Sequence, residues 1–558
     1  MHDNVGGVQL VFAAVAGAAA MAALIVAYRR YKVAESIAAL ERVNAQLEQI
    51  QVYDEQFTAA AAQIDDEKAA IRLAGVRAMA GLADYWPEHR QACVDVLCGY
   101  LRMPHSPNRS QGAPPEDRLK FDSARDVHDT VLRIITSHLR PGAEVSWRGL
   151  DFDFTGVALD DGDFSGVGFA GGEVSFGGAE FSGGQVSFNG AEFSGGEVSF
   201  GGAKFSSGQV SFAGAEFSGG EVSFNGAEFS GGEVSFGGAE FSGGKVGFAG
   251  AEFSGGRVDF RRAKFSGSEV GFRRAKFSGG EVSFGRTQFS DERAGLGFAG
   301  FSGAEFSDGE ISFSGAEFSG SQVGFGGGTF SGAQVGFGGA EFSAGKVSFA
   351  DAMFSRGEVN YRGARFTGGE VSFGFAAFAG GEISFSGARF TGGEVSFGFA
   401  AFAGGQLSFN DAEFSGGLVD FRSARFSGAR ISFVLAKFPG GRVSFLLTKF
   451  SGGQASFNGA KFSGALVDFS GTRFSGGLVD FFTAEFSGGL VSFDGAQFTS
   501  PVSFLLARFS GGQVDFSKVA DWSQHPNFDG GGTQPSGVRL PTGSGTSGAS
   551  EGPTSAGS

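Results

Sequence analysis

Cysteine, histidine and tryptophan are scarce in this chain of 558 residues, which holds 2 Cys, 6 His and 3 Trp. Cys93 and Cys98 lie five residues apart in a predicted helix, where they cannot easily form a disulfide and do not form a metal site. We expect them to be small buried residues of a reducing compartment. The histidines have no fixed spacing to a nucleophile, and the repeated Ser and Glu residues lie on a surface that does not perturb their pKa. The sequence therefore predicts no catalytic residue, no metal and no cofactor.

Phenylalanine and glycine dominate instead, with 68 and 99 residues. From about residue 152 to residue 516, Phe recurs at alternating steps of five and seven, as at Phe188, Phe193, Phe200 and Phe205. Each unit of twelve reads V-x-F-x-x, then A-x-F-x-x, then two spare residues. One such unit is too small to bury its own aromatic side chains, so the units must stack into a solenoid.

An apolar run near the amino end predicts a membrane span. Val8 to Tyr28 carries no formal charge, and 21 helical residues extend about 31 Å, close to the thickness of a bilayer core. A cleaved signal peptide would have its positive charges before the run, whereas Arg29, Arg30 and Lys32 follow it. By the positive-inside rule, residues 1–7 lie outside and the rest of the chain is cytoplasmic. We expect a single-pass protein of the cell membrane, with its transmembrane helix at 8–28.

Residues 29–52 are predicted to continue as a juxtamembrane helix. Val33, Ile37, Leu40 and Leu47 keep a four-three spacing, and Asn44 occupies the one polar position of the seam. This pattern indicates a short coiled coil, which would make a homo-oligomer through residues 33–52. A helix that packs on its own domain fits two heptads equally well, so both interpretations stay open.

A small α-helical region is expected at 53–146, with a flexible, proline-rich loop at 103–118. Asp65 or Asp66 is predicted to cap its first helix, and its last helix is predicted from about Ser123 to Leu139. The side chains expected to point inward from the first helix are Ile71, Ala74, Ala78 and Leu82.

From Trp147 the helical spacing gives way to a spacing of five. Phe152-Asp-Phe154-Thr-Gly and Val157-Ala-Leu159-Asp-Asp follow one another without spare residues. These units closely resemble those of pentapeptide repeat proteins, which have a small residue at i−2 and Leu or Phe at i. The resemblance covers roughly two thirds of the chain and implies a mainly β fold, a right-handed quadrilateral parallel β-helix. The stretch from Gln56 to Arg140 also resembles the helical leader of membrane-anchored bacterial members.

The solenoid is predicted at 147–522. A tail at 523–558, rich in Gly, Ser, Thr and Pro, is expected to be disordered, and Trp522 is expected to cover the last turn. The spare residues favour about 24 residues per coil, because a coil of twelve would crowd two Phe, a Val and an Ala into a two-sided tube. Fifteen or so turns would then give a rod of about 70 Å.

Two irregularities test this register. A five-residue unit inserted near 294–306 is expected to rotate the wide corners by one face, with a kink or surface discontinuity there. One spare residue is missing at 499–501.

The outward residue before each Phe is patterned by charge. An acidic stripe is predicted at Glu180, Glu192, Glu216, Glu228, Glu240 and Glu252. A basic interaction stripe is predicted at Arg425, Lys437, Lys449, Lys461 and Arg473. A solvated face that keeps the rod soluble is the alternative interpretation of both. The net charge of −16 disfavours nucleic acid as a partner.

These observations predict a non-catalytic, membrane-anchored scaffold that presents a rigid solenoid surface to an unknown protein partner. The resemblance adds an alternative, because some pentapeptide repeat proteins mimic DNA and modulate type II topoisomerases. A self-associating structural rod is the third candidate.

Overall fold

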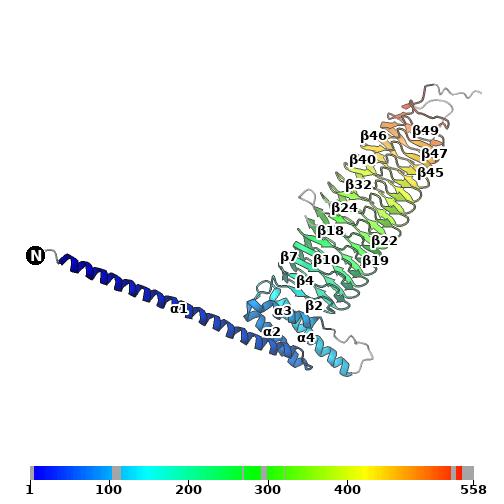
Figure 1. Ribbon diagram of the computed structural model, residues 1–558. Helices are drawn as coiled ribbons and strands as arrows, with labels where there is room; N and C mark the ends of the chain where they lie inside the picture. Colours follow the sequence, from blue (N-terminus) through cyan, green and yellow to red (C-terminus); the bar gives the residue numbers. More distant parts are fainter. Residues whose placement is uncertain are drawn as a thin grey trace, which may run out of the picture. The chain divides into compact units, whose positions relative to one another are not determined.

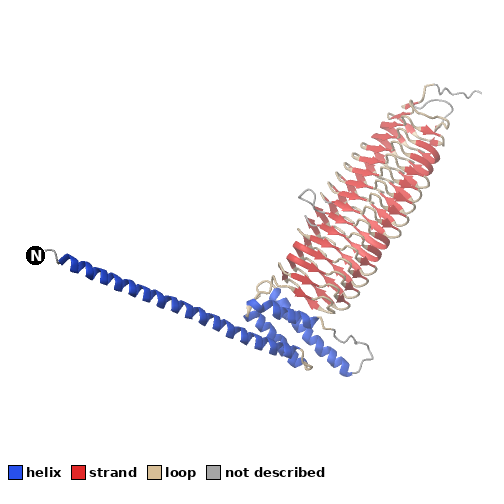
Figure 2. Ribbon diagram, viewed as in Figure 1, coloured by secondary structure: helices blue, strands red, loops and turns tan. Residues whose placement is uncertain are grey.

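The computed structural model describes residues 5–103, 115–266, 269–290, 298–320, 322–528 and 536–542. The chain divides into two units, Met1–Leu97 and Cys98–Ser558. Its helices are α1 (Val5–Ile64), α2 (Ala69–Tyr85), the 3₁₀ turn η1 (Pro87–His89), α3 (Arg90–Leu101) and α4 (Pro115–Leu139). Strands follow from Phe152 onward (Figure 2).

The first helix is a single element of 60 residues. It contains no proline, so nothing interrupts it where the predicted span at 8–28 meets the predicted juxtamembrane helix at 29–52. It includes a run that is long and apolar enough to cross a membrane. Every residue from Leu10 to Val52 is exposed, and Tyr53 is the first buried one.

The end of α1 packs against α2 within the first unit. Gly75 lies at a close approach of the two helices, since a Cβ there would come within 2.7 Å of the Ile64 backbone nitrogen. The side of α2 that carries Gly75 is therefore its buried face. It consists of Gly75, Val76, Met79, Ala80, Leu82 and Ala83. The prediction that Ala74 and Ala78 point inward is therefore wrong, because both are exposed. The predicted cap at Asp65 or Asp66 is wrong, because Lys68 is the N-cap of α2 and no side chain caps the helix. Asp66 instead accepts the N–H of Lys68 at 2.7 Å, just before the helix begins.

The second unit contains a parallel β-solenoid (Figure 1). Among the described residues, 28 strands form a first sheet and 26 form a second. Glu216 pairs with Glu240 and Val222 pairs with Val246, so one turn takes about 24 residues and the solenoid has about 15 turns. The predicted coil of 24 is confirmed over the coil of twelve. Each turn passes through two faces of the first sheet and then two of the second.

The two spare residues widen the corner between the faces of one sheet, as predicted. In several turns the strand runs through that corner and is eight residues long. These strands are β7 (Glu192–Ser199), β10 (Glu216–Ser223), β19 (Lys276–Ser283), β22 (Glu305–Ser312), β45 (Lys449–Ser456), β46 (Lys461–Asp468), β47 (Arg473–Asp480) and β48 (Glu485–Ser492). The remaining described strands have two or three residues. A bulge in the β7–β10 pairing falls at Gly219, where the chain bends.

Phenylalanine ladders fill the interior. Phe188, Phe212 and Phe236 stack in consecutive turns with ring centroids 4.7 and 4.8 Å apart. The Phe200 ring stands nearly perpendicular to Phe212, at 5.6 Å and 88°, which suits the quadrupoles of the two rings. Val and Ala at i−2 are buried beside the rings, as predicted. Each buried Phe contributes about 1.5–3 kcal/mol to folding.

The narrow corners connect the two sheets and require a left-handed residue. Gly178 and Gly202 take this position with φ of 64° and 65°, a conformation that glycine adopts without steric cost. The Ser between Val and Phe is less exposed than predicted. Ser444 is buried, and Ser175 Oγ accepts the Gly177 N–H at 3.3 Å, because this side chain folds back onto the corner.

The insertion near 294–306 does not rotate the corners. Val270 pairs with Ala299, five positions later than in an ordinary turn, and the Phe272 ring stacks on Phe301 at 4.6 Å in an unbroken ladder. Between Ser290 and Phe298 the chain has seven residues where other turns have two. The extra five are added at one corner there, and most of the predicted unit lies outside the described residues. At the other irregularity Val479 pairs with Val502, one position earlier than in an ordinary turn, so one corner is a residue shorter.

Both ends of the solenoid are covered. At the first turn, α4 contacts β2 (Gly162–Asp163), Arg140 pairs with Asp163 at 2.6 Å, and the buried Trp147 stacks on His138 at 4.0 Å. Helix α4 begins at Pro115, before the predicted Ser123 and inside the predicted loop 103–118, of which 104–114 lies outside the described residues.

At the last turns, Trp522 packs edge-on against Phe498 and Phe516, at 5.6 and 5.3 Å. The predicted end of the solenoid at 522 and the predicted disorder after it are wrong for part of the tail. The strands β53 (Asn527–Phe528) and β54 (Val538–Arg539) pair with β50 (Val502–Phe504) and β52 (Gln513–Asp515) and extend the coil. Residues 529–535 and 543–558 lie outside the described residues.

Candidate interaction surfaces

The predicted acidic stripe is divided between the two sheets. A step of twelve residues is half a turn, so Glu192, Glu216 and Glu240 form a column on the first sheet. The second sheet carries Glu180, Glu228 and Glu252, with Lys204 between the first two. Each column then meets a lysine: Lys264 Nζ is 2.7 Å from Glu240, and Lys276 Nζ is 2.8 Å from Glu252. Hydrogen bonding to Glu252 raises the pKa of Lys276.

The predicted basic stripe is divided in the same way. Arg425, Lys449 and Arg473 stack in consecutive turns of the second sheet, while Lys437 and Lys461 pair on the first. Lys461 is compensated by Glu485 at 3.3 Å. Among the described residues, no carboxylate lies within 4.0 Å of Arg425 or Lys449. The second-sheet trio therefore forms an uncompensated cationic ladder.

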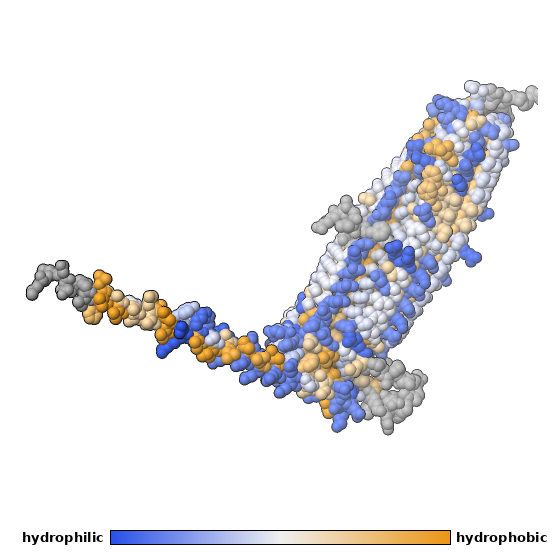
Figure 3. Space-filling model, viewed as in Figure 1, coloured by the Kyte–Doolittle hydropathy of each residue, from blue (hydrophilic) through white to orange (hydrophobic). Residues whose placement is uncertain are grey.

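That ladder continues an apolar column. Met353, Ala377, Ala401 and Arg425 are paired in consecutive turns. We call the six residues Met353, Ala377, Ala401, Arg425, Lys449 and Arg473 the mixed column. Its first half is exposed and apolar, and its second half is cationic. Apolar residues gather among hydrophilic ones on the C-terminal half of the solenoid in Figure 3.

An apolar ridge that was not predicted from the sequence runs beside this column at the narrow corner. We call Phe375, Phe399 and Leu447 the corner ridge; Ser423 takes the corner position in the turn between Phe399 and Leu447. The three ridge residues occupy the left-handed corner position with φ of 59°, 60° and 57° and expose 64%, 55% and 54% of their surface. The Phe375 and Phe399 rings stack at 5.0 Å, outside the core. The signal in the sequence is the Gly-Phe that replaces Gly-Gly in Ser-Phe-Gly-Phe-Ala-Ala-Phe, which occurs at 372–378 and 396–402.

The corner ridge is unfavourable for the isolated fold. A left-handed conformation costs a residue with a Cβ about 1–2 kcal/mol relative to glycine, and bulky side chains rarely adopt it. The opposite narrow corner carries Leu435 and Leu506 in the same conformation, also largely exposed. Large apolar side chains are thus placed where they add strain and little core packing.

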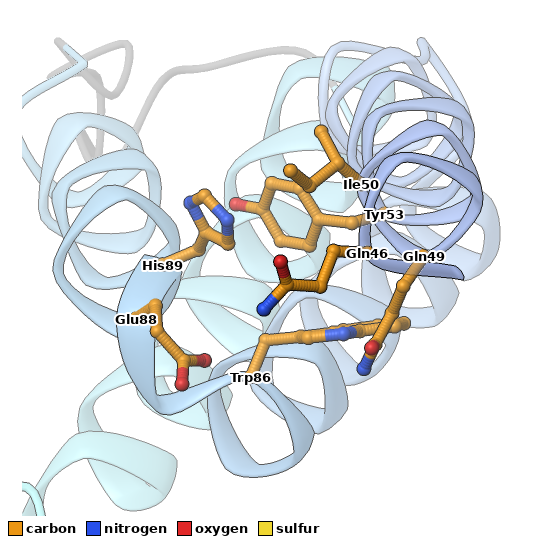
Figure 4. Close-up of a pocket in the computed structure, with 7 residues that line it drawn as sticks. All are labelled: Gln46, Gln49, Ile50, Tyr53, Trp86, Glu88 and His89. Atoms are coloured by element: carbon orange, nitrogen blue, oxygen red, sulfur yellow. The ribbon is translucent and has the colours of Figure 1, made fainter. Parts of the chain in front are cut away.

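The helical unit contains a cavity of about 350 Å³ (Figure 4). Gln46, Gln49, Ile50 and Tyr53 line it from α1, and Trp86, Glu88 and His89 line it from the turn after α2. The Tyr53 ring stacks on His89 at 4.3 Å and meets Trp86 edge-on at 5.4 Å.

Tyr53 is buried, and so are the two cysteines, as predicted. Tyr53 Oη lies 3.6 Å from Cys93 Sγ. Burial raises the pKa of the Tyr53 phenol and of the Cys93 thiol. Both groups stay protonated at neutral pH, and a protonated thiol is a poor nucleophile. The cluster therefore packs the helices together and does not resemble a catalytic site.

Comparison of the chain with protein-family models, curated proteins and solved structures finds no match. The parallel solenoid with a Phe about every five residues is consistent with a pentapeptide-repeat fold.

Proposed function

We propose that this protein is a non-catalytic scaffold, anchored in a membrane by α1, whose solenoid binds another protein. The corner ridge is the observation that carries this proposal. Phe375 and Phe399 hold a strained backbone and expose apolar rings, and neither property stabilises the fold. A partner that covers the rings explains why they stand where glycine would serve the fold better.

The interior suits a scaffold because it fixes the spacing of the surface. Each outward position is held by the ladder beneath it, and successive turns are about 4.8 Å apart. Outward residues vary from turn to turn, from Glu216 to Met353 to Arg425, above an almost constant core. Binding specificity can therefore change along the rod without a change of fold.

The sequence around α1 supports the proposed anchor and its orientation. The apolar run is followed by Arg29, Arg30 and Lys32, which favours a cytoplasmic solenoid at the cell membrane. With the five-residue recurrence of Phe, this arrangement supports membership of the membrane-anchored bacterial pentapeptide repeat proteins. The exposed Val33, Ile37, Leu40 and Leu47 leave a heptad seam free for a parallel coiled coil with a second copy.

The surface charges weigh against the DNA-mimicking alternative. A mimic of the phosphate backbone needs a long run of negative charge, whereas Lys204, Lys264 and Lys276 interrupt the acidic columns and pair with their glutamates. Exposed apolar residues lie at both narrow corners, Phe375 and Phe399 at one and Leu435 at the other. Two copies could therefore associate through them, so a self-associating rod remains an outcome of the test.

The test places a photo-crosslinking amino acid at position 399 of the full-length protein in cells. The matched control has it at position 202, the same corner in the N-terminal half. We expect position 399 to capture a specific second protein from purified membranes, and position 202 to capture none. Adducts of the protein with itself alone would support the self-associating rod. Equal capture from both positions would contradict the proposal.

A second measurement tests the anchor and its orientation. Deletion of residues 8–28 should release the protein from the membrane fraction. Protease added to intact spheroplasts should leave the solenoid uncut, and it should cut only after lysis. Cleavage before lysis would place the solenoid outside.

A further inference from the structure

We infer that the corner ridge and the mixed column bind one acidic polypeptide segment that lies along the rod, with apolar side chains at one end and carboxylates at the other. This inference rests on the proposed function and adds the chemistry of the partner. The apolar end would cover Met353, Phe375 and Phe399, and the acidic end would reach Arg425, Lys449 and Arg473.

The register of the strands places these contacts in one line. The six residues of the mixed column are paired in six consecutive turns, so five steps of about 4.8 Å span about 24 Å. An extended chain covers this distance with about seven residues at 3.3 Å each. A short linear segment therefore matches the whole column.

Electrostatics specifies the acidic end. Like charges directly opposite one another on adjacent strands destabilise a sheet, and Arg425, Lys449 and Arg473 form such a run. Arg473 Nε donates to Gln497 at 2.9 Å, which leaves its charge without a counterion there.

Three other cations of this sheet have carboxylate partners, in the pairs Lys204–Glu180, Arg257–Glu281 and Lys276–Glu252. Arg430, on the next face of the same sheet, is paired with Gln406 and Gln454. Carboxylates of a bound segment would compensate the ladder, and Arg425 and Arg473 can each hold one of them with two parallel hydrogen bonds.

The neighbouring faces favour a polypeptide over an anionic bilayer. In the turns of Phe375 and Phe399, Glu370 and Glu394 lie on the face before the corner. On the face beyond the mixed column, Glu358 lies in the turn of Met353 and Glu382 in the turn of Phe375. Burial raises the pKa of Glu394, and the negative charges of Glu370 and Asp420 raise it further. A plane of anionic lipid would meet these carboxylates, whereas a single chain along the column avoids them.

The test selects a displayed library of random peptides against the full-length protein in nanodiscs of neutral phosphatidylcholine. We expect the enriched peptides to combine Phe, Leu or Ile with a cluster of Glu or Asp at one end. Their affinity should fall at least about tenfold in R425Q/K449Q and in F375G/F399G, and it should weaken with added salt. Enriched peptides without net negative charge, or with equal affinity for both variants, would overturn the inference, as would the absence of enrichment.

Controls separate binding from folding. F375G/F399G introduces the residue that the same corner holds at Gly178 and Gly202, so the variant should unfold at the same temperature or higher. K437Q/K461Q removes two cations from the other sheet and should leave peptide affinity unchanged. Equal loss in K437Q/K461Q would mean a nonspecific charge effect and would overturn the inference.

Two further outcomes identify which proposal fails. The protein could bind phosphatidylserine vesicles and lose this binding in F375G/F399G, while no peptide is enriched. That result would make the corner ridge a membrane contact and would overturn the inference of an acidic segment. Capture of a protein through position 399 that R425Q/K449Q does not weaken would uphold the scaffold and overturn the inference. No capture through position 399 would contradict the scaffold itself.

Discussion

Tyr361 carries the hydroxyl group that distinguishes one ring of the core ladder from its neighbours. The ring is fully buried and stacks at 4.7 Å on both Phe337 and Phe385. Among the described residues its Oη has no hydrogen-bond partner, and burial raises its pKa well above the ordinary value. A buried hydroxyl without a partner costs about 1–3 kcal/mol. The substitution Tyr361→Phe removes that cost and keeps the ring, so it should stabilise the solenoid locally.

Amide hydrogen exchange measures this effect at the turn where it arises. The Tyr361 N–H donates to Ser384 O at 2.6 Å, and the Phe385 N–H donates to Ser408 O at 2.7 Å. Because stability in a solenoid is mainly a sum over neighbouring turns, these amides should exchange about five- to 150-fold more slowly in Tyr361→Phe. Amides near Phe200 should be unaffected.

The reverse substitution one turn on is the matched control. Phe385 is as buried as Tyr361 and lies in the same ladder, so Phe385→Tyr should accelerate exchange by a similar factor. Unchanged or faster exchange in Tyr361→Phe would refute the reasoning, because it would show that the hydroxyl has a partner in the native protein, such as a buried water.

Three further predictions concern the ends, the insertion and pH. Deletion of residues 292–296 should leave the unfolding temperature of the solenoid within about a degree, because it restores an ordinary turn of two corner residues; a large loss would show that the insertion packs on the rod. Truncation after Trp522 should lower the unfolding temperature and truncation after Thr542 should not, because only the first removes β53 and β54; equal values would show that the added strands contribute nothing. The helical unit should lose stability as pH rises, since Cys93 and Tyr53 have raised pKa values when folded. The contribution of these two groups to stability is complete below their unfolded pKa values of about 8.5 and 10 and declines above them. The unfolding temperature of a fragment of residues 1–97, followed by ellipticity, should therefore be lower at pH 10.5 than at pH 8. The difference between the two temperatures should be smaller in Tyr53→Phe.

The coil and its core could be predicted because each interior position has one physical task. Phe, Val and Ala recur in every turn at the positions that the ladder buries. The extra strands at Phe528 and Val538 were missed because the intervening composition resembles a disordered tail. The signal was nevertheless present, since each lies one full turn after its partner, Phe504 or Val514.

The charge stripes could not be predicted from consecutive units. Arg425 and Lys437 are neighbours in the repeat but lie on different sheets, because one unit is only half a turn. Residues that share a surface are those a full turn apart. The insertion shows the same rule: five added residues kept the columns in place, because displacing one face would have taken every Phe ladder beyond it out of register.

The separation of core from surface explains how the corner ridge is tolerated. The strain at Phe375 and Phe399 is about 1–2 kcal/mol each, which is comparable to the burial of a single Phe of the ladder. Each turn buries four large rings or their equivalents, as at Phe373, Phe378, Phe385 and Phe390, so a turn can carry one strained corner and remain folded. A small globular domain buries less apolar surface with which to offset the strain of each exposed site. The repeat architecture therefore allows a costly apolar site to be placed at almost any height along the rod, and the stretch from Met353 to Arg473 is where this chain has done so.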